Sequence, residues 1–291
     1  MGWLKGSIVA LSTPFDDRDR VNERTLAKLF EFHKQNGTDA ILLAGTTGES
    51  ATLTEDEKLA MFEFGKREAG LPIIAGTGTN STEKTVEFTK KAEQIGVDAC
   101  LVITPYYNKP TQGGLIAHFT AVASAVGVPI IIYNVPGRTG VNILPETVKE
   151  LSSIPNIVGI KEASGNLHQI SEMIRITPDD FVLLSGDDNL TLPILCLGGD
   201  GVISVTANIA PKDMSRMVNA GLEGDFAQAR ELHHKLFTLT KLLFIETNPI
   251  PVKTALREMG FDMGRFRLPL VEMKAENKEL LLDEMRRLGL L

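Results

Sequence analysis

The sequence predicts an α/β fold, a (β/α)₈ TIM barrel followed by a C-terminal α-helical extension. Eight short apolar runs recur along the 291-residue chain, and each is followed by a turn and a segment with helical periodicity. Strands that alternate with helices of this length indicate right-handed βαβ units and a parallel sheet. Eight such units before about residue 220 match a (β/α)₈ barrel, whose typical length is ~250 residues.

Strands and helices that follow one another in this regular order are also compatible with a doubly wound open sheet. That alternative fold usually carries a Gly-rich turn after its first strand. Here that strand leads into Ser12-Thr13-Pro14-Phe15, which favours the barrel. The helical segments between the strands include 23–36, 55–69 and 82–95. The predicted strands are 7–11, 40–44, 72–76, 99–104, 129–134, 157–163, 181–186 and 201–205.

After the eighth unit the pattern becomes purely helical. Apolar residues from Leu222 to Leu243 fall at helical spacing and predict one long amphipathic helix that begins at Leu222. The segment Asn248-Pro249-Ile250-Pro251 ends this region, and further helices are predicted at 252–259 and 275–288. We therefore predict a barrel with the active site over 1–224 and a helical domain over 225–291, packed on the barrel or on a partner subunit.

Composition limits the classes of function. The net charge of −7, with 30 Lys+Arg against 37 Asp+Glu and no basic stripe, argues against nucleic-acid binding. No apolar stretch reaches the ~18 residues of a membrane span, and the N-terminus lacks a signal-peptide core. Cys100 and Cys196 lie in apolar runs and are interpreted as small core residues. We expect a reduced, soluble, cytoplasmic protein.

Lys161 is the first candidate catalytic residue, because it closes the apolar run 157–160. Burial disfavours the charged ammonium and lowers the pKa of a lysine. A partly neutral amine in a shielded pocket is suited to forming a Schiff base with a carbonyl compound. The alternative is a strand-end lysine that reaches water or pairs with Glu162.

The turn after the second strand, Gly45-Thr46-Thr47-Gly48-Glu49-Ser50, is a candidate anion site. Successive backbone N–H groups and Thr hydroxyls in a Gly-flanked turn can hold a small carboxylate. The alternative is a plain turn with a helix cap. The turn is not a P-loop, because no Gly-Lys-Ser/Thr follows it.

All three tyrosines, Tyr106, Tyr107 and Tyr133, lie at the ends of the fourth and fifth strands. Period-two alternation puts Tyr133 on one face of its strand and Lys161 on one face of the next. If both faces point into the barrel, phenol and amine meet in one pocket. Tyr133 can then shuttle protons, with Thr46 and Tyr107 as supporting hydroxyls.

A glycine and an arginine complete the candidate site, whereas the histidines are not part of it. Gly159, two residues before Lys161, is expected to leave room for a substrate carbon. Arg138, in the loop Pro136-Gly137-Arg138-Thr139-Gly140, is suited to bidentate carboxylate binding, unless it is simply an exposed loop residue. The five histidines are scattered on helical segments, so no metal site is predicted. No cofactor motif appears, and the chemistry is assigned to a covalent imine on Lys161.

Seven short blocks of sequence occur in a fixed order along the chain. They are GTTGESATL (45–53), YY (106–107), YNVPGRTG (133–140), GIKEASGN (159–166), LSGDD (184–188), GVISVTAN (201–208) and ETNPIPVK (246–253). Together they resemble the dihydrodipicolinate synthase family of class I pyruvate-dependent aldolases. The resemblance implies a homotetramer built as a dimer of tight dimers. It also implies that pyruvate condenses with L-aspartate 4-semialdehyde to give 4-hydroxy-tetrahydrodipicolinate, in the diaminopimelate route to lysine.

The same resemblance implies a role for each matching position. It makes Lys161 the Schiff-base lysine and Tyr133 the proton donor and acceptor. The remaining implied roles are proton relay for Thr46 and for Tyr107 of a neighbouring subunit, pyruvate binding for Thr47 and Ile203, pocket lining for Gly186, and semialdehyde-carboxylate binding for Arg138.

A departure from the family pattern concerns inhibition by lysine. Family members that are inhibited bind lysine near the positions of Ser50, Ala51, Asn80 and Tyr106. They carry histidines where this chain has Glu55 and Lys58, and a glutamate where it has Lys84. A cationic Lys84 would repel the ammonium groups of lysine. We therefore expect weak or absent feedback by lysine.

Two rival functions are compatible with parts of the sequence. N-acetylneuraminate lyase and 2-keto-3-deoxy-sugar-acid aldolases share the Lys and Tyr, but Arg138 suits a short substrate with its own carboxylate better than a polyol. A non-catalytic keto-acid sensor would need neither Tyr133 nor the supporting hydroxyls.

Overall fold

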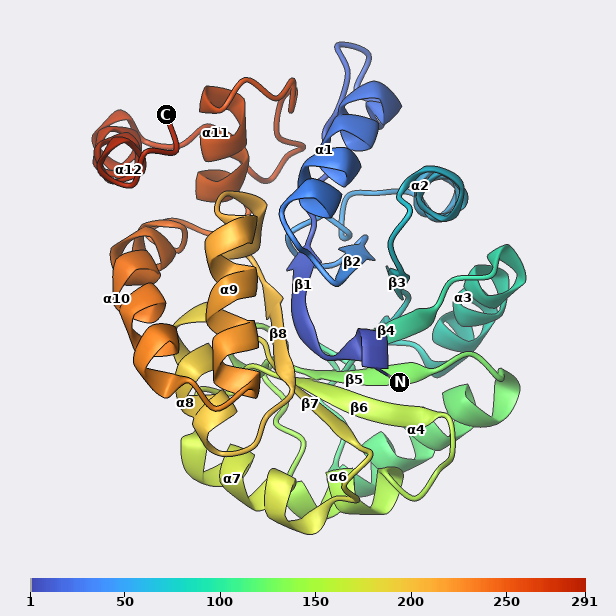
Figure 1. Cartoon of the computed structure of the whole chain (residues 1–291). Helices are drawn as coiled ribbons and strands as arrows, with labels where there is room; N and C mark the ends of the chain where they lie inside the picture. Colours follow the sequence, from blue (N-terminus) through green and yellow to red (C-terminus); the bar gives the residue numbers. More distant parts are fainter. Residues whose placement is uncertain (1) are drawn as a thin grey trace.

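The computed structural model describes residues 2–291 as a closed parallel barrel, and the predicted fold class is confirmed. The eight strands pair in chain order, and the last pairs with the first. Figure 1 shows helices forming a ring around them. The strands are β1 (Gly6–Ala10), β2 (Ala40–Leu43), β3 (Ile73–Gly76), β4 (Ala99–Ile103), β5 (Ile130–Asn134), β6 (Ile157–Glu162), β7 (Val182–Ser185) and β8 (Gly201–Ser204).

The bounds of each predicted strand lie within one residue of those observed. Helices of the barrel follow the strands along the chain. A short 3₁₀ segment, η1 (Gly2–Leu4), precedes β1, and two others, η2 (Asp188–Leu190) and η3 (Thr206–Asn208), follow β7 and β8. The helices are α1 (Glu23–Gln35), α2 (Glu55–Glu68), α3 (Thr82–Ile95), α4 (Gln112–Ala125), α5 (Pro136–Thr139), α6 (Pro145–Leu151), α7 (Leu167–Ile176), α8 (Thr191–Cys196) and α9 (Pro211–Leu222).

Side-chain caps explain where several helices begin. At α2 the Thr54 hydroxyl accepts from the Glu57 backbone N–H at 3.2 Å, and the Glu57 carboxylate accepts from the Thr54 N–H at 2.8 Å. This reciprocal capping box satisfies two donors that the helix cannot satisfy itself. Asn22 and Ser81 cap α1 and α3 in the same position.

Period-two alternation separates two layers of core. Inward residues, such as Ile8, Leu42, Ile131 and Leu184, fill the barrel, and the residues next to them pack under the helices. The strands are therefore largely apolar on both faces, as expected for a parallel sheet that is covered on both sides.

The C-terminal region consists of α10 (Phe226–Leu242), α11 (Ile250–Glu258) and α12 (Ala275–Arg287). Figure 1 shows α11 and α12 on the outside of the barrel, beyond α9 and α10. The prediction of one helix beginning at Leu222 is wrong, because Leu222 ends α9 and Asp225 caps a separate helix. Gly224, with φ 82°, allows the chain to turn between them.

The two cysteines differ in their surroundings. Cys100 is buried in the core as predicted, but Cys196 is exposed at the end of α8, so its interpretation as a core residue is wrong. Its apolar neighbours in sequence do not determine which side of a short helix faces solvent. Within residues 2–291, no helix is long and apolar enough to span a membrane.

Candidate active site

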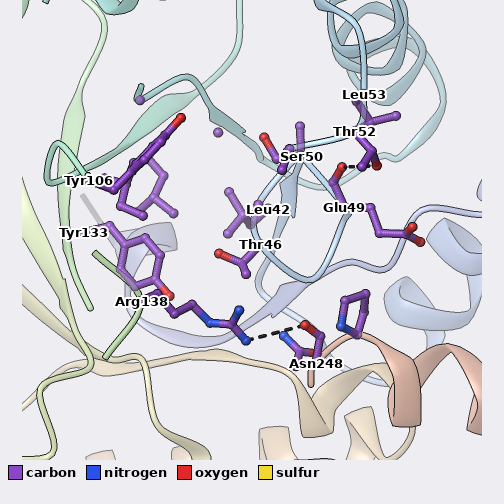
Figure 2. A pocket seen from close by; sticks show the side chains of 18 of the residues that line it. Leu42, Thr46, Glu49, Ser50, Thr52, Leu53, Tyr106, Tyr133, Arg138 and Asn248 are labelled. Carbon is purple, nitrogen blue, oxygen red and sulfur yellow. Dashed lines mark hydrogen bonds between the residues drawn. The ribbon is translucent and has the colours of Figure 1, made fainter. Parts of the chain in front are cut away.

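A cavity of about 420 Å³ opens at the C-terminal ends of the strands, where the sites of such barrels lie. Its wall combines residues from β2 to β6 with the C-terminal segment around Asn248 (Figure 2). Lys161, Tyr133, Thr46 and Arg138 all line it, so the structure brings together four of the predicted site residues.

The Lys161 amine lies inside this cavity rather than in solvent. Lys161 pairs in register with Tyr133 on the neighbouring strand, and its Nζ lies 4.5 Å from the centre of the Tyr133 ring. The residue is 5% exposed. Burial lowers the pKa of Lys161 to about 8, with Arg138 acting in the same direction and the Asp188 carboxylate opposing it. The alternative of a lysine that reaches water is thereby excluded.

Tyr133 is a buried phenol with polar neighbours. Burial raises the pKa of Tyr133, while the Arg138 charge and a hydrogen bond with the Thr46 side chain oppose the rise. The phenol therefore carries its proton at neutral pH, and the Thr46 side chain beside it is a hydroxyl that can pass a proton on. Figure 2 shows Thr46, Tyr133 and Arg138 around one space.

Thr47 and Ile203 lie behind the residues that form the cavity wall, and both are almost fully buried. The Thr47 hydroxyl accepts a 3.0 Å hydrogen bond from Nδ2 of Asn248, which does line the cavity. Ile203 packs in the inner layer of the barrel together with Tyr133. Both predicted pyruvate-binding residues are thus neighbours of wall residues.

The two glycines at the site have different surroundings. A Cβ on Gly186 would lie 3.1 Å from Cε of Lys161, so glycine leaves space for the lysine side chain. The expectation that Gly159 leaves room for substrate is wrong. A Cβ there would lie 2.5 Å from the Val182 carbonyl oxygen, so Gly159 instead allows β7 to approach closely.

The remaining predicted residues lie toward the outside. Tyr107 is 89% exposed and does not line the cavity of its own chain. Of the region expected to respond to lysine, Ser50, Ala51, Lys58 and Tyr106 line the same cavity as Lys161. Glu55, Asn80 and Lys84 do not. Across residues 2–291 no cluster of three or more His, Cys, Asp or Glu side chains is placed to hold a metal ion.

Sequence reasoning missed two residues of the site. Asn248 lines the cavity, its carbonyl oxygen lies 3.5 Å from Nη2 of Arg138, and its Oδ1 is buried without a partner. Asp188 is buried near Lys161 and accepts hydrogen bonds from Ser204 and from the Val205 N–H. The only signal for either was membership of the ETNPIPVK or LSGDD block.

Comparison with known proteins agrees with this geometry. The model of the dihydrodipicolinate synthetase family matches residues 3–287. The chain belongs to this family. A relative from Thermodesulfovibrio yellowstonii named 4-hydroxy-tetrahydrodipicolinate synthase is 53% identical over 290 residues, covering 99% of both chains. A relative of the same name from Archaeoglobus fulgidus is 51% identical, again over 99% of both.

Solved structures of the family share the whole fold. The dihydrodipicolinate synthase of Aquifex aeolicus superposes with a TM-score of 0.96 at 50% identity, covering 98% of each chain. A chloride-inhibited dihydrodipicolinate synthase from Acinetobacter baumannii, solved with pyruvate, gives 0.96 at 45% identity over 99% of each chain. The resemblance inferred from the seven sequence blocks is thus confirmed.

Proposed function

We propose that this protein is a lyase that condenses pyruvate with L-aspartate 4-semialdehyde to give 4-hydroxy-tetrahydrodipicolinate, in lysine biosynthesis through diaminopimelate. The observation that carries the proposal is the buried Lys161 amine beside the Tyr133 ring, in a cavity that Arg138 also lines. The full-length similarity to enzymes named for this product supports it.

The chemistry begins with the neutral Lys161 amine. It attacks the keto carbon of pyruvate, and loss of water gives a protonated imine that acts as an electron sink. Loss of a methyl proton then gives an enamine, whose carbon attacks the aldehyde carbon of the second substrate while the aldehyde oxygen takes up a proton. The amino group of the semialdehyde then attacks the imine carbon, which closes the ring and releases the Lys161 amine. Tyr133 moves these protons, with Thr46 and the Tyr107 of a neighbouring subunit as the relay.

The residues around the amine hold the two substrates. The turn at Thr47, together with Ile203 and Gly186, receives pyruvate and its carboxylate. Arg138 binds the carboxylate of the semialdehyde at the open end of the cavity, where a guanidinium can form two parallel hydrogen bonds. The imine on Lys161 supplies the electron sink, so the scheme uses the protein's own amine in place of a cofactor.

The assembly and location of the protein complete the proposal. A homotetramer built as a dimer of dimers would bring Tyr107 to the partner's site, and we place the protein in the cytoplasm. One solved relative, 43% identical, is described as a monomeric variant, so sedimentation or light scattering of this chain is the appropriate measurement. We also propose that the chain divides into a barrel domain over 1–224 and a helical domain over 225–291.

The decisive experiment is a coupled assay with pyruvate and aspartate semialdehyde. Turnover of this pair, together with a reduced pyruvyl adduct on Lys161 after borohydride treatment, is the expected result. Preference for cleaving N-acetylneuraminate or a 2-keto-3-deoxy-sugar acid would overturn the substrate choice. Pyruvate binding without any adduct would instead support a sensor.

A further inference from the structure

The C-terminal segment is bonded directly to the turn that carries Thr46 and Thr47. Besides the bond between Asn248 and Thr47, the Arg267 guanidinium donates to the Thr52 carbonyl at 2.9 Å. These partners are separated by more than two hundred residues in the sequence. The helical extension therefore reaches over the barrel and contacts a wall of the active-site cavity.

A buried ion pair lies at the centre of this contact. Nζ of Lys253 lies 2.6 Å from the Glu49 carboxylate, and both side chains are 0% exposed. The same Nζ donates to the Arg265 carbonyl at 2.9 Å and lies 4.2 Å from the centre of the Phe15 ring. The second Glu49 oxygen accepts from the Arg267 N–H at 3.3 Å.

Stability alone does not account well for such a pair. Removing two charges from water is costly, and an apolar pair of similar volume often stabilises a fold equally well. An ion pair with additional hydrogen bonds instead specifies the geometry of the two segments, because its charges and hydrogen-bonding atoms are all satisfied in one arrangement only. The pair therefore specifies how the turn lies against the C-terminal segment.

The backbone of the turn needs such a restraint. Glu49 has φ 56°, a left-handed conformation that is unfavourable for a residue with a side chain. Its N–H donates to the Thr46 carbonyl at 3.1 Å, so the conformation of Glu49 is coupled to Thr46, whose side chain lines the same cavity as Tyr133. Glu49 itself lines the same cavity.

We propose that Glu49 and Lys253 are positioning residues, whose buried ion pair locks the Gly45–Ser50 turn in the conformation that holds Thr46 beside Tyr133 and Thr47 at the pyruvate pocket. This inference rests on the proposed function. It makes the helical extension a working part of the active site rather than an attachment to it.

The test compares variants in which the pair is removed with a variant that is destabilised elsewhere. The double variant Glu49→Gln/Lys253→Met removes both charges and leaves no unpaired one. Leu281→Ala, in the buried face of α12, lowers stability without touching the turn. Borohydride trapping on Lys161 gives the pyruvate concentration for half-maximal adduct, and the coupled assay gives kcat and KM.

We expect the double variant to need about tenfold more pyruvate for half-maximal trapping, the scale of one well-placed hydrogen bond, and to lose kcat as well. Leu281→Ala should lower the melting temperature with the pyruvate dependence unchanged. If the double variant does not fold, Glu49→Asp, which keeps both charges but shortens the link between the turn and Lys253, should raise the pyruvate requirement in the same way.

Pyruvate dependence within twofold of the wild type in either folded variant would overturn the inference. The inference would also fail if Leu281→Ala shifted the pyruvate dependence as much as the loss of the pair, since the effect would then be general destabilisation. A wild-type protein that neither traps pyruvate nor turns over would contradict the proposed function instead.

Discussion

The lowered pKa of Lys161 can be tested through the pH dependence of imine formation. With its pKa lowered to about 8 by burial, about one tenth of the amine is neutral at pH 7. A lysine with the ordinary value of about 10.5 would be neutral in only about 3 molecules in 10,000. The cavity therefore raises the reactive fraction about 300-fold at neutral pH.

Two substitutions should move this pKa in opposite directions. The Arg138 charge lowers the pKa of Lys161, so Arg138→Gln should raise it and shift the rate profile to higher pH. The Asp188 carboxylate raises the same pKa, so Asp188→Asn should shift the profile to lower pH. Ionisation of Tyr133 does not contribute to the rate profile below pH 10, because burial raises its pKa above the ordinary value of about 10.

The assay is the initial rate of adduct formation with pyruvate and cyanoborohydride between pH 6 and 10. Mass spectrometry assigns the adduct to Lys161 and separates it from any adduct on Lys58, which also lines the cavity. The wild-type rate should rise about tenfold per pH unit and level off near pH 8. A wild-type midpoint near 10.5, or a shift of both variants in the same direction, would refute the electrostatic argument.

Three further predictions concern proton transfer, acid stability and regulation. Tyr133→Phe should keep the fold, checked by circular dichroism, and lower kcat roughly a hundredfold or more; near-normal turnover would remove Tyr133 from the mechanism. Burial lowers the pKa of His33 to about 3, so the unfolded chain binds its proton more readily and stability falls as pH drops below 6.5. His33→Leu should therefore lose about 2 kcal/mol less than the wild type between pH 7 and pH 5 in urea titrations; an equal loss in both proteins would contradict the burial argument. Millimolar lysine should leave the rate nearly unchanged at fixed pH, and Lys84→Glu should increase any inhibition; strong inhibition of the wild type would contradict the charge argument.

Sequence reasoning succeeded where a property depends on neighbouring residues. Alternation of apolar residues located the eight strands, and it put Tyr133 on one face of its strand and Lys161 on one face of the next. The register of the two strands then brings these residues together in the structure. It failed where burial depends on distant segments. The run around Cys196 is apolar, yet this side chain faces solvent, and the space expected at Gly159 is taken by the backbone of β7.

The amino-acid sequence by itself determined the order of strands and helices, the strand-end position of Lys161 and the family to which the chain belongs. Each of these follows from local periodicity or from short blocks of residues. Only the tertiary structure decided that Asn248 and Lys253 meet the turn after β2, and that Asp188 lies near the reactive amine. Such contacts arise when the barrel closes and the C-terminal helices pack over it, and residues far apart in the chain leave no periodic signal of their meeting.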